Sequence, residues 1–443
     1  MPRFSHLARA LSLVVGCPFL TLGILKAEPP NILFILADDL GYGDLGCYGA
    51  DDLKTPHLDQ LAKDGVRFTS YYANGSTCSP TRAAFVTGRY QQRLGLDNAL
   101  TYQEMGRGLP PNGQTIATDL RAKGCATGLT GKWHLGYDFE RKPLQQGFDH
   151  FFGLLGGNHH YFQHMDRIGV PDLWSGNEEV RRDEYSTDLM TEDSIAFLRD
   201  HRDRPFLLYL AHPAPHFPWQ GPMDRDKVIE PKKKSWQEGD RETYIAMVEH
   251  LDAGIGQTLA ELDRLGLREK TLVVFSSDNG GHTYSRNAPL HGEKGTLWEG
   301  GIRVPCIARW PGVLKAGSEF AEPCITLDWT ATFRRLAGWP ADPAIEDGVD
   351  LMPALTGKEK LAERSLFWRR QSGPRRKVEI EEQAVRHGPW KWLRRDGEAM
   401  LFDLETDLSE TNNVIAAHPE IARQLTQAWE AWDAEMDASP KLP

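Results

Sequence analysis

Four apolar stretches, far apart in the chain, are each followed by side chains that can bind ions or transfer protons. In chain order, these side chains are Asp38 and Asp39, Lys132 and His134, His216, and Asp278 with Asn279. Open α/β sheets bind their ligands beyond the carboxyl ends of the strands, where residues from separate strands meet. The pattern therefore predicts one catalytic crevice assembled from distant segments.

The residues after the first and the last of these stretches all offer oxygen atoms. This donor set consists of Asp38, Asp39, Asp278 and Asn279. Such a set suits a hard cation, calcium or magnesium, better than zinc. Taken singly, two successive aspartates are also typical of a helix cap, and the DNGG sequence that starts at Asp278 is typical of a tight turn.

A second group of residues offers positive charge or N–H donors to an anionic ligand. It consists of Lys132, His134, His216 and Lys294. Each of them alone is equally compatible with a solvated or internally bonded side chain. The formal charge of −11 excludes a generally basic nucleic-acid binder, whose affinity rests on neutralising phosphates. A small anionic substrate is compatible with this charge, because the local field governs binding in a pocket.

The alternation of strand and helix patterns predicts the fold class. Runs typical of buried strands cover residues 31–37, 126–130, 205–211, 271–276 and 302–308. Helical patterns cover residues 55–64, 114–123 and 244–265. This order predicts an α/β fold with a large mixed, mainly parallel sheet between helices. The 443 residues suffice for one large domain with a small appendage, and no internal repeat indicates a solenoid.

The C-terminal part has the pattern of a separate small unit. Residues 338–357 are rich in Pro, Gly and Asp and predict the break. Strand patterns cover residues 383–394 and 398–403, and a helical pattern covers residues 419–436. Ile421, Leu425, Trp429 and Trp432 lie at helical spacing and are expected to pack on the core. We expect a small antiparallel sheet with one helix.

The N-terminus has the features of an export signal. Arg3 and Arg9 accompany the start of an apolar run over residues 11–25, and a turn-like EPP sequence follows at residues 28–30. This pattern predicts a cleaved signal peptide, residues 1–27, and a periplasmic or secreted protein. The alternatives are an uncleaved anchor and a lipid anchor at Cys17. No other segment has the length and hydropathy of a membrane span.

Cysteines are sparse for an exported protein. Besides Cys17 they are Cys47, Cys78, Cys125, Cys306 and Cys324, with no CxxC and no zinc spacing. The core, rather than disulfides, is therefore expected to carry the stability. Cys306 and Cys324 are a candidate pair that the sequence alone leaves open.

One segment, STCSPTRAAFVTGR at residues 76–89, carries a specific signature. Its Cys78, Pro80 and Arg82 resemble the C-x-P-x-R motif of the formylglycine-dependent sulfatases, a family of the alkaline phosphatase-like superfamily. Similar motifs follow in the family's order: ADDLG (37–41), GKWHLG (131–136), PHFP (215–218), SDNGG (277–281), HGEKGTLWEGGIRVP (291–305), LFDL (401–404) and ETNN (410–413). The resemblance spans almost the whole chain. Within the family, the chain resembles the carbohydrate sulfatases.

The resemblance implies a nucleophile and a metal site. Cys78 would be oxidised to formylglycine by a maturation enzyme. One calcium ion would be held by Asp38, Asp39, Asp278 and Asn279, with the modified Cys78 completing the shell. The hydrated aldehyde would offer two hydroxyls on one carbon. One attacks sulfur, and collapse of the other expels sulfate, which a serine ester could not do; this is covalent catalysis in two steps.

The resemblance also implies roles for the cationic residues. Arg82 would hold the nucleophile and balance the carboxylates, and His134 would take up a proton during product release. Lys132, Lys294 and His216 would bind the sulfate oxygens. Either His216 or Lys294 would help to protonate the leaving oxygen.

The segment GFDHFFGLLGGNHHYFQ, residues 147–163, bears on the substrate. In the carbohydrate sulfatases that it resembles, this stretch lies near the rim of the active site. Asn158, His159 and His160 would then contact a sugar. The alternative is an aromatic-rich packing loop.

Two basic stretches have alternative interpretations. Lys232, Lys233 and Lys234 are expected to lie in a solvated loop. The denser stretch consists of Arg364, Arg369, Arg370, Arg375, Arg376 and Lys377. It would either extend a binding cleft for a polyanionic chain or form the exposed rim of a hairpin.

The sequence therefore predicts a sulfuric ester hydrolase that acts on a sulfated carbohydrate. We expect a catalytic domain over residues 28–345 and a C-terminal subdomain over residues 346–443. One alternative is a phosphodiesterase or phosphonate monoester hydrolase of the same superfamily. The other is a non-catalytic sugar-binding protein whose Cys78 is never modified.

Overall fold

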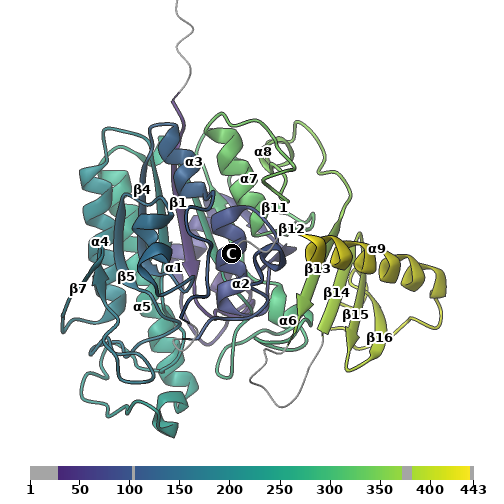
Figure 1. The fold of residues 1–443 in the computed structure, drawn as a ribbon, viewed down its shortest axis with the longest axis horizontal. Helices are drawn as coiled ribbons and strands as arrows, with labels where there is room; N and C mark the ends of the chain where they lie inside the picture. Colours follow the sequence, from purple (N-terminus) through teal and green to yellow (C-terminus); the bar gives the residue numbers. More distant parts are fainter. Residues whose placement is uncertain (1–27, 102–104, 372–381, 440–443) are drawn as a thin grey trace, which may run out of the picture.

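The structure, a computed structural model, describes residues 28–101, 105–371 and 382–439 (Figure 1). The predicted signal peptide, residues 1–27, lies outside the described residues. The same holds for three residues of the second basic stretch, Arg375, Arg376 and Lys377. Everything below refers to the described parts of the chain.

A large sheet organises the fold. Its strands are β1 (Asn31–Ala37), β2 (Val66–Phe68), β4 (Ala126–Lys132), β5 (His150–Leu154), β6 (Trp174–Ser175), β7 (Glu178–Glu179), β8 (Phe206–Ala211), β9 (Thr271–Ser277), β10 (Cys306–Arg309) and β11 (Ser318–Phe320). Their spatial order is β11-β2-β10-β9-β1-β8-β4-β5-β6-β7. The central strands β9, β1, β8, β4 and β5 pair in parallel, and β10 pairs antiparallel with both of its neighbours.

Strand β1 lies at the centre and divides the core into two apolar layers. Ile32, Phe34 and Leu36 belong to one apolar cluster, and Leu33 and Ile35 belong to the other. Because both faces are covered, the strand is apolar at successive positions instead of alternating with polar residues. This explains why an uninterrupted apolar run in the sequence predicts it.

Helices cover both faces of the sheet (Figure 1). One layer contains α1 (Pro56–Lys63), α4 (Ser186–Asp200) and α5 (Arg241–Arg264). The other contains α2 (Cys78–Thr87), α3 (Ile116–Ala122) and α7 (Leu327–Leu336). Shorter elements are β3 (Tyr71–Tyr72), which pairs with β12 (Cys324–Ile325), and the helices α6 (Glu299–Ile302) and α8 (Met352–Leu355). The predicted α/β class with a mainly parallel sheet is confirmed.

A second, antiparallel sheet lies beside the large one (Figure 1). It consists of β13 (Ser365–Arg370), β14 (Glu382–His387), β15 (Trp390–Arg395) and β16 (Glu398–Asp403), and α9 (Pro419–Ala438) packs on it. Leu425, Trp429 and Trp432 of α9 are buried there. The small sheet with one helix is confirmed, whereas the domain boundary at residues 345–346 stays a prediction.

The second basic stretch belongs to the interior rather than to an open cleft, as far as it is described. Arg369, on β13, is only 6% exposed. Its guanidinium pairs with Asp97, Asp433 and Asp437, at 2.9, 2.6 and 2.9 Å. Arg364 pairs with a buried carboxylate of α7. These arginines therefore fasten the small sheet to its surroundings and are not free to bind a polyanion.

Two other expectations need correction. The strand predicted over residues 302–308 begins only at Cys306, because α6 ends at Ile302 and Pro305 has no N–H to donate to a ladder. Cys306 and Cys324 are both free thiols, so the candidate disulfide is not formed. Among the described residues, no helix combines the length and the apolar character that crossing a membrane requires.

Candidate active site

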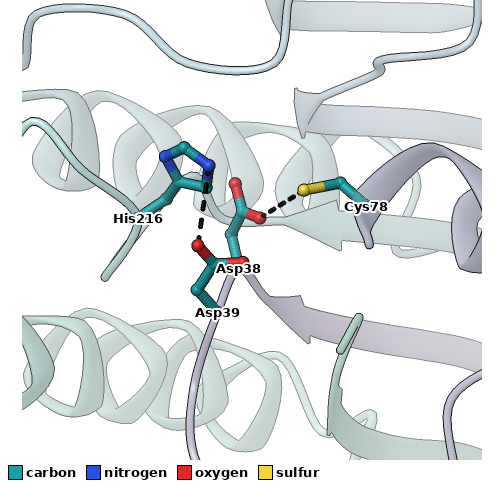
Figure 2. A group of neighbouring side chains, drawn as sticks. All are labelled: Asp38, Asp39, Cys78 and His216. Atoms are coloured by element: carbon teal, nitrogen blue, oxygen red, sulfur yellow. Dashed lines mark hydrogen bonds and ion pairs between the residues drawn. The ribbon is translucent and has the colours of Figure 1, made fainter. Parts of the chain in front are cut away.

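The carboxyl ends of the parallel strands bring the predicted site residues together. Asp38 and Asp39 follow β1, and His216 follows β8. Cys78 is the first residue of α2. One ligand atom of each of these four residues lies within 4.8 Å of the others, and all four side chains are buried (Figure 2). The crevice expected from separate strand ends is therefore present.

Cys78 lies between a carboxylate and an ammonium group. Its Sγ is 3.5 Å from Asp38 Oδ1 and 3.5 Å from Lys294 Nζ. Burial raises the pKa of the Cys78 thiol to about 12. At neutral pH the thiol is therefore protonated, and an unmodified Cys78 is a poor nucleophile in this environment.

Arg82 lies one turn further along α2 and fixes the carboxylate of Asp278. Its Nε and Nη2 donate to Asp278 Oδ2 at 3.1 and 2.8 Å, and Nη1 donates to the carbonyl of Lys132 at 3.0 Å. Both side chains of this ion pair are fully buried. Both hydrogen bonds from the guanidinium end on the same oxygen, Oδ2, and hold the Asp278 carboxylate in place.

Two lysines neutralise the aspartates after β1. Lys132 Nζ donates to Asp38 Oδ2 at 2.6 Å, and Lys294 Nζ is 2.6 Å from each oxygen of Asp39. Burial raises the pKa of Asp38 to about 8, although Lys132 opposes the shift. For Asp39, burial is outweighed by Lys294 and by His216, which together hold its pKa below the ordinary value.

The oxygen donors fit a hard cation. Asn279 is fully buried, and its Nδ2 donates to Asp39 Oδ1 at 2.7 Å. Its Oδ1 finds no donor among the described residues. A buried amide oxygen without a hydrogen-bond partner costs free energy. The amide group of Asn279 lies beside the Asp39 carboxylate, which Lys294 and His216 already face. Together with Asp38, Asp39 and Asp278 it forms the kind of oxygen set that calcium or magnesium requires.

His134 is arranged as a neutral base. Its Nε2 lies 2.7 Å from the carbonyl oxygen of Leu100. A carbonyl only accepts, so Nε2 carries the proton and Nδ1 has the free electron pair. Burial, with Lys132 adding to the effect, lowers the pKa of His134 well below its ordinary value. Gly157 permits this placement, because a Cβ there would lie 2.8 Å from the imidazole Cε1.

His216 faces the second aspartate. Its Nδ1 lies 2.6 Å from the carbonyl oxygen of Phe217, which fixes the ring, and its Nε2 is 3.6 Å from Asp39 Oδ2. Burial lowers the pKa of His216, and Lys294 contributes in the same direction. In Figure 2 the ring points toward Asp39.

A cavity of about 630 Å³ opens onto this group. Cys78, His134, His216, Lys294 and Asn158 all line it. Lys132 lies outside the lining and is buried behind Asp38. The volume is within the range of small-molecule sites, roughly 300–1,000 Å³.

The structure places Asn158 at the cavity but not His159 and His160. Asn158 Oδ1 accepts a hydrogen bond from Trp236 Nε1 at 3.0 Å. His159 points inward, with Nδ1 3.1 Å from the carbonyl oxygen of Asp172 and Nε2 2.9 Å from Ser186 Oγ. Both histidines are at most 2% exposed. We therefore leave them out of the sugar-binding set.

His160 instead shapes the loop that lines the cavity. Its Nδ1 accepts hydrogen bonds from the backbone N–H groups of Phe162 and Gln163, at 3.2 and 3.0 Å. Its Nε2 lies 3.3 Å from Gln220 Nε2. Burial lowers the pKa of His160 to about 4, so the ring is neutral and able to accept. His159 and His160 thus stabilise the loop through hydrogen bonds.

Two cationic lining residues are not among the site residues expected from the sequence. Arg167 and Lys232 both border the cavity. Lys232 belongs to the lysine run that was interpreted as a solvated loop, and Arg167 carries no motif. The backbone hydrogen bond from Lys232 N to Arg167 O, at 2.9 Å, joins the two segments.

The fold is alkaline phosphatase-like, and the site combines oxygen donors that suit a cation with a buried cysteine. The comparison with known families is specific. Residues 30–339 match the family model described as Sulfatase, and residues 291–435 match one described as N-sulphoglucosamine sulphohydrolase, C-terminal. The chain belongs to the Sulfatase family, and it is a sulfuric ester hydrolase.

Individual relatives agree with this assignment. Human arylsulfatase A is 33% identical over 95% of this chain and 90% of its own length. The N-acetylgalactosamine-6-sulfatase of the dog is 34% identical over 77% of this chain and 69% of its own length. The crystal structure of Ps i-CgsB has a TM-score of 0.84 and 33% identity, and the match covers 94% of each chain. Ps i-CgsB has also been solved in complex with k-i-k-neocarrahexaose.

Proposed function

We propose that this chain is an exported, calcium-dependent carbohydrate sulfatase whose nucleophile is a formylglycine made from Cys78. The position of Cys78 carries the proposal. Its Sγ lies 3.5 Å from Asp38 Oδ1 and 3.5 Å from Lys294 Nζ, and the residue lines the cavity. A nucleophile at this point meets an anionic ester where positive charge offsets the negative charge of the ester.

In this proposal Asp38, Asp39, Asp278 and Asn279 hold the calcium ion. The unpartnered Oδ1 of Asn279 supports the assignment, because it gains a ligand that the protein itself does not provide. When bound, calcium supplies Lewis-acid polarisation of the sulfate oxygens. Arg82 keeps Asp278 in place through its two hydrogen bonds to Oδ2.

Lys294 and His216 are the groups that receive the sulfate in the cavity. Both line it, and Lys294 stays protonated because the Asp39 carboxylate raises its pKa against the effect of burial. Because the carbonyl of Phe217 accepts the hydrogen of Nδ1, His216 donates to the sulfate from Nε2 as an imidazolium. Lys132 supports Asp38 from behind at 2.6 Å. Donors that are fixed in this way need little reorganisation as charge develops on the leaving oxygen.

His134 accepts a proton at Nδ1 during product release. This nitrogen is buried without a partner among the described residues, while Nε2–H is held by the carbonyl of Leu100. A neutral imidazole with one free electron pair at a cavity wall is in the protonation state that this role requires. The formylglycine at position 78 supplies a nucleophile that is regenerated in each turnover.

A sugar is the substrate class that the surroundings favour. The cavity lining includes the polar residues Thr101, Tyr137 and Asn158, a composition that is compatible with a hydroxyl-rich ligand. Relatives that are named for sugar substrates support the same class, as does the oligosaccharide in the Ps i-CgsB complex.

The proposal is tested by the chemistry at position 78 and by the product. The protein is co-expressed with a formylglycine-generating enzyme, and the peptide that contains Cys78 is analysed by mass spectrometry. Sulfate release is then measured on sulfated oligosaccharides, with a phosphate diester and a phosphonate monoester as competing substrates. We expect an aldehyde at position 78 and hydrolysis of sulfate esters above the other two classes.

Other results would overturn the proposal. A thiol at position 78 in protein from the native host, without turnover of any ester, would indicate a sugar-binding protein. Preferred hydrolysis of the phosphorus esters would indicate the related hydrolases. Export is tested separately by N-terminal sequencing of the protein from its host. An intact Met1 in cytoplasmic protein would contradict a cleaved signal peptide.

A further inference from the structure

Two cationic side chains at the cavity lie outside the group that surrounds Cys78. Arg167 and Lys232 come from different segments, and both are exposed. Their backbones are joined by the hydrogen bond from Lys232 N to Arg167 O at 2.9 Å. Both positive charges therefore belong to one edge of the cavity, which we call the cationic rim.

The rim is built on a constrained loop. The Asp166 carboxylate accepts hydrogen bonds from the backbone N–H groups of Ile168 and Val170, at 2.9 and 2.8 Å. Asp172, nearby in the same loop, accepts from Leu155 N and Gly156 N at 2.9 and 2.8 Å. The backbone that carries Arg167 is thus held by hydrogen bonds on both sides.

The positive charges of Arg167 and Lys232 are not neutralised by ion pairs within the described part of the chain. Neither Arg167 nor Lys232 forms an ion pair there. Asp166 is the carboxylate close to Lys232, and it is only 6% exposed and occupied by backbone donors. By contrast, Lys132 and Lys294 are both engaged by aspartates. The rim is therefore available to a ligand that the inner group does not bind.

The charge of the whole molecule makes these two residues significant. The chain has a formal charge of −11, so a polyanion is repelled by most of its surface. Two cations without an ion pair among the described residues make the field at the mouth of the cavity more positive. A ligand with a single sulfate, once bound beside Cys78, has no group for them, whereas an oligosaccharide with a second anionic group does.

We infer that Arg167 and Lys232 form a second anion-binding subsite, which selects sulfated oligosaccharides that carry another sulfate or carboxylate on a neighbouring sugar. This inference rests on the proposed function and adds the substrate class: a polyanionic chain rather than a monosulfated sugar. Arg167 offers a planar donor pair to an oxyanion, and Lys232 adds a point charge. The subsite contributes to binding and not to bond cleavage.

Binding is measured by calorimetry on the Cys78→Ala protein, so that no turnover is needed. The probes are two carrageenan hexasaccharides with the same galactan backbone, one with one sulfate per disaccharide and one with two. We expect tighter binding of the more sulfated chain. Arg167→Ala and Lys232→Ala should each weaken it by about two- to fivefold, as expected for exposed charge pairs, and added salt should reduce the preference.

Lys233→Ala is the matched control, because this neighbouring lysine is exposed but does not line the cavity. It should leave both affinities unchanged. Equal or absent binding of the two hexasaccharides, or a preference that survives the double variant Arg167→Ala/Lys232→Ala, would overturn the subsite. A general loss with Lys233→Ala as well would show a diffuse field effect and would also overturn it.

Turnover separates this inference from the proposed function. With 4-nitrophenyl sulfate, whose leaving group carries no second anion, the rim variants should keep the kcat/KM of the otherwise unaltered enzyme. If that enzyme hydrolyses no sulfate ester at all, the proposed function fails while the calorimetry still decides the subsite. If it is active and the rim variants show an unchanged preference, only the subsite fails.

Discussion

Residues 291–305 contribute to two clusters of buried charge that use similar residue types in different surroundings. The first, here the site cluster, consists of Asp38, Asp39, Asp278, Arg82, Lys132 and Lys294. The second, here the junction cluster, consists of Glu299, Glu410, Lys391, Arg303 and Arg386. Lys294 belongs to the first and Glu299 to the second, so one sequence motif serves both.

The junction cluster ties the small sheet to the large one. Lys391 Nζ, on β15, lies 3.0 Å from Glu299 Oε1 and 2.7 Å from Glu410 Oε1. Tyr72 OH donates to Glu299 Oε2 at 2.7 Å, and Glu410 Oε2 accepts from the backbone N–H of Glu299 at 2.6 Å. These ion pairs and hydrogen bonds are all formed between residues of the protein itself.

The site cluster differs from the junction cluster in its access to a cavity. It borders a cavity, holds the Cys78 thiol, and lies beside the unpartnered Oδ1 of Asn279. The residues of the junction cluster are absent from the lining of that cavity. Buried charge alone therefore does not mark an active site, because structural networks also bury charge. The feature that distinguishes the site cluster is the cavity that opens onto it.

The largest effect is expected at Cys78. Cys78→Ala should lower sulfate release by a factor of about 10⁴ or more, because the nucleophile is lost. The melting temperature should stay within about 2 °C, since only one sulfur atom is removed. Steady-state assays and thermal unfolding measure the two quantities. Cys306→Ala is the control, because it removes another fully buried thiol and should keep the activity.

Cys78→Ser sharpens the same point. A serine offers one hydroxyl and would form a sulfate ester that it cannot release by aldehyde formation. We expect at most one sulfate transferred for each active site, detected as a mass increase of the peptide that contains residue 78. Sustained turnover by Cys78→Ser would contradict the proposed role of formylglycine.

The junction cluster should respond in stability. Lys391→Met leaves Glu299 and Glu410 buried without their shared cation and should lower the free energy of unfolding by about 3–5 kcal/mol. Chemical denaturation measures this change. The double variant Lys391→Met/Glu410→Gln should recover part of it, because one of the uncompensated charges is removed.

An exposed lysine provides the control for that experiment. Lys233→Met should change the free energy of unfolding by no more than about 0.5 kcal/mol. If Lys391→Met changes the free energy of unfolding as little as Lys233→Met does, the junction cluster contributes nothing to stability. The similar residue types of the two clusters would then have no common energetic role.

Removal of the metal should affect the site cluster and leave the junction cluster unchanged. The expected effect is of intermediate size. Chelation with EGTA is expected to abolish activity and to lower the melting temperature by about 3 °C, which corresponds to the loss of a ligand present at about a hundredfold its Kd. Calcium should restore both. Asp39→Asn should lose the response to calcium, whereas Glu410→Gln should keep it. Restoration by magnesium alone would overturn the choice of calcium.

The sequence predicts those parts of the site that lie at strand ends. The strands that became β1, β4, β8 and β9 are buried on both faces and therefore appear as apolar runs with clear ends. The side chains that follow such an end point toward the same edge of the sheet. For this reason Asp38, Asp278 and His216 were predictable without knowledge of any contact.

Loop side chains are different, because their direction depends on partners that are distant in sequence. His159 is drawn inward by Ser186, and His160 by Gln220, while Asn158 beside them faces the cavity. No periodic pattern distinguishes the three. Arg369 was likewise unpredictable, since its three carboxylate partners lie on other segments.

The smallest effect concerns the pH response of the junction cluster. Burial raises the pKa of Glu410 from 4.5 to about 7, although Lys391 opposes the shift. A carboxyl whose pKa is raised by folding binds extra protons in the folded state. Its contribution to stability is therefore complete below about pH 4.5 and is lost as the pH rises through about 7. Glu410→Gln has no group that titrates in this window.

The melting temperature of the wild type minus that of Glu410→Gln should accordingly fall by about 3 °C between pH 5 and pH 8. Glu405→Gln, at an exposed position, should show a constant difference over the same range. Thermal unfolding at several pH values measures both series. A difference for Glu410→Gln that is constant, or that grows with pH, would mean that Glu410 stays ionised. The cations of the junction cluster would then fully compensate the charge of Glu410. In both clusters the positive charges would balance the buried carboxylates to the same extent.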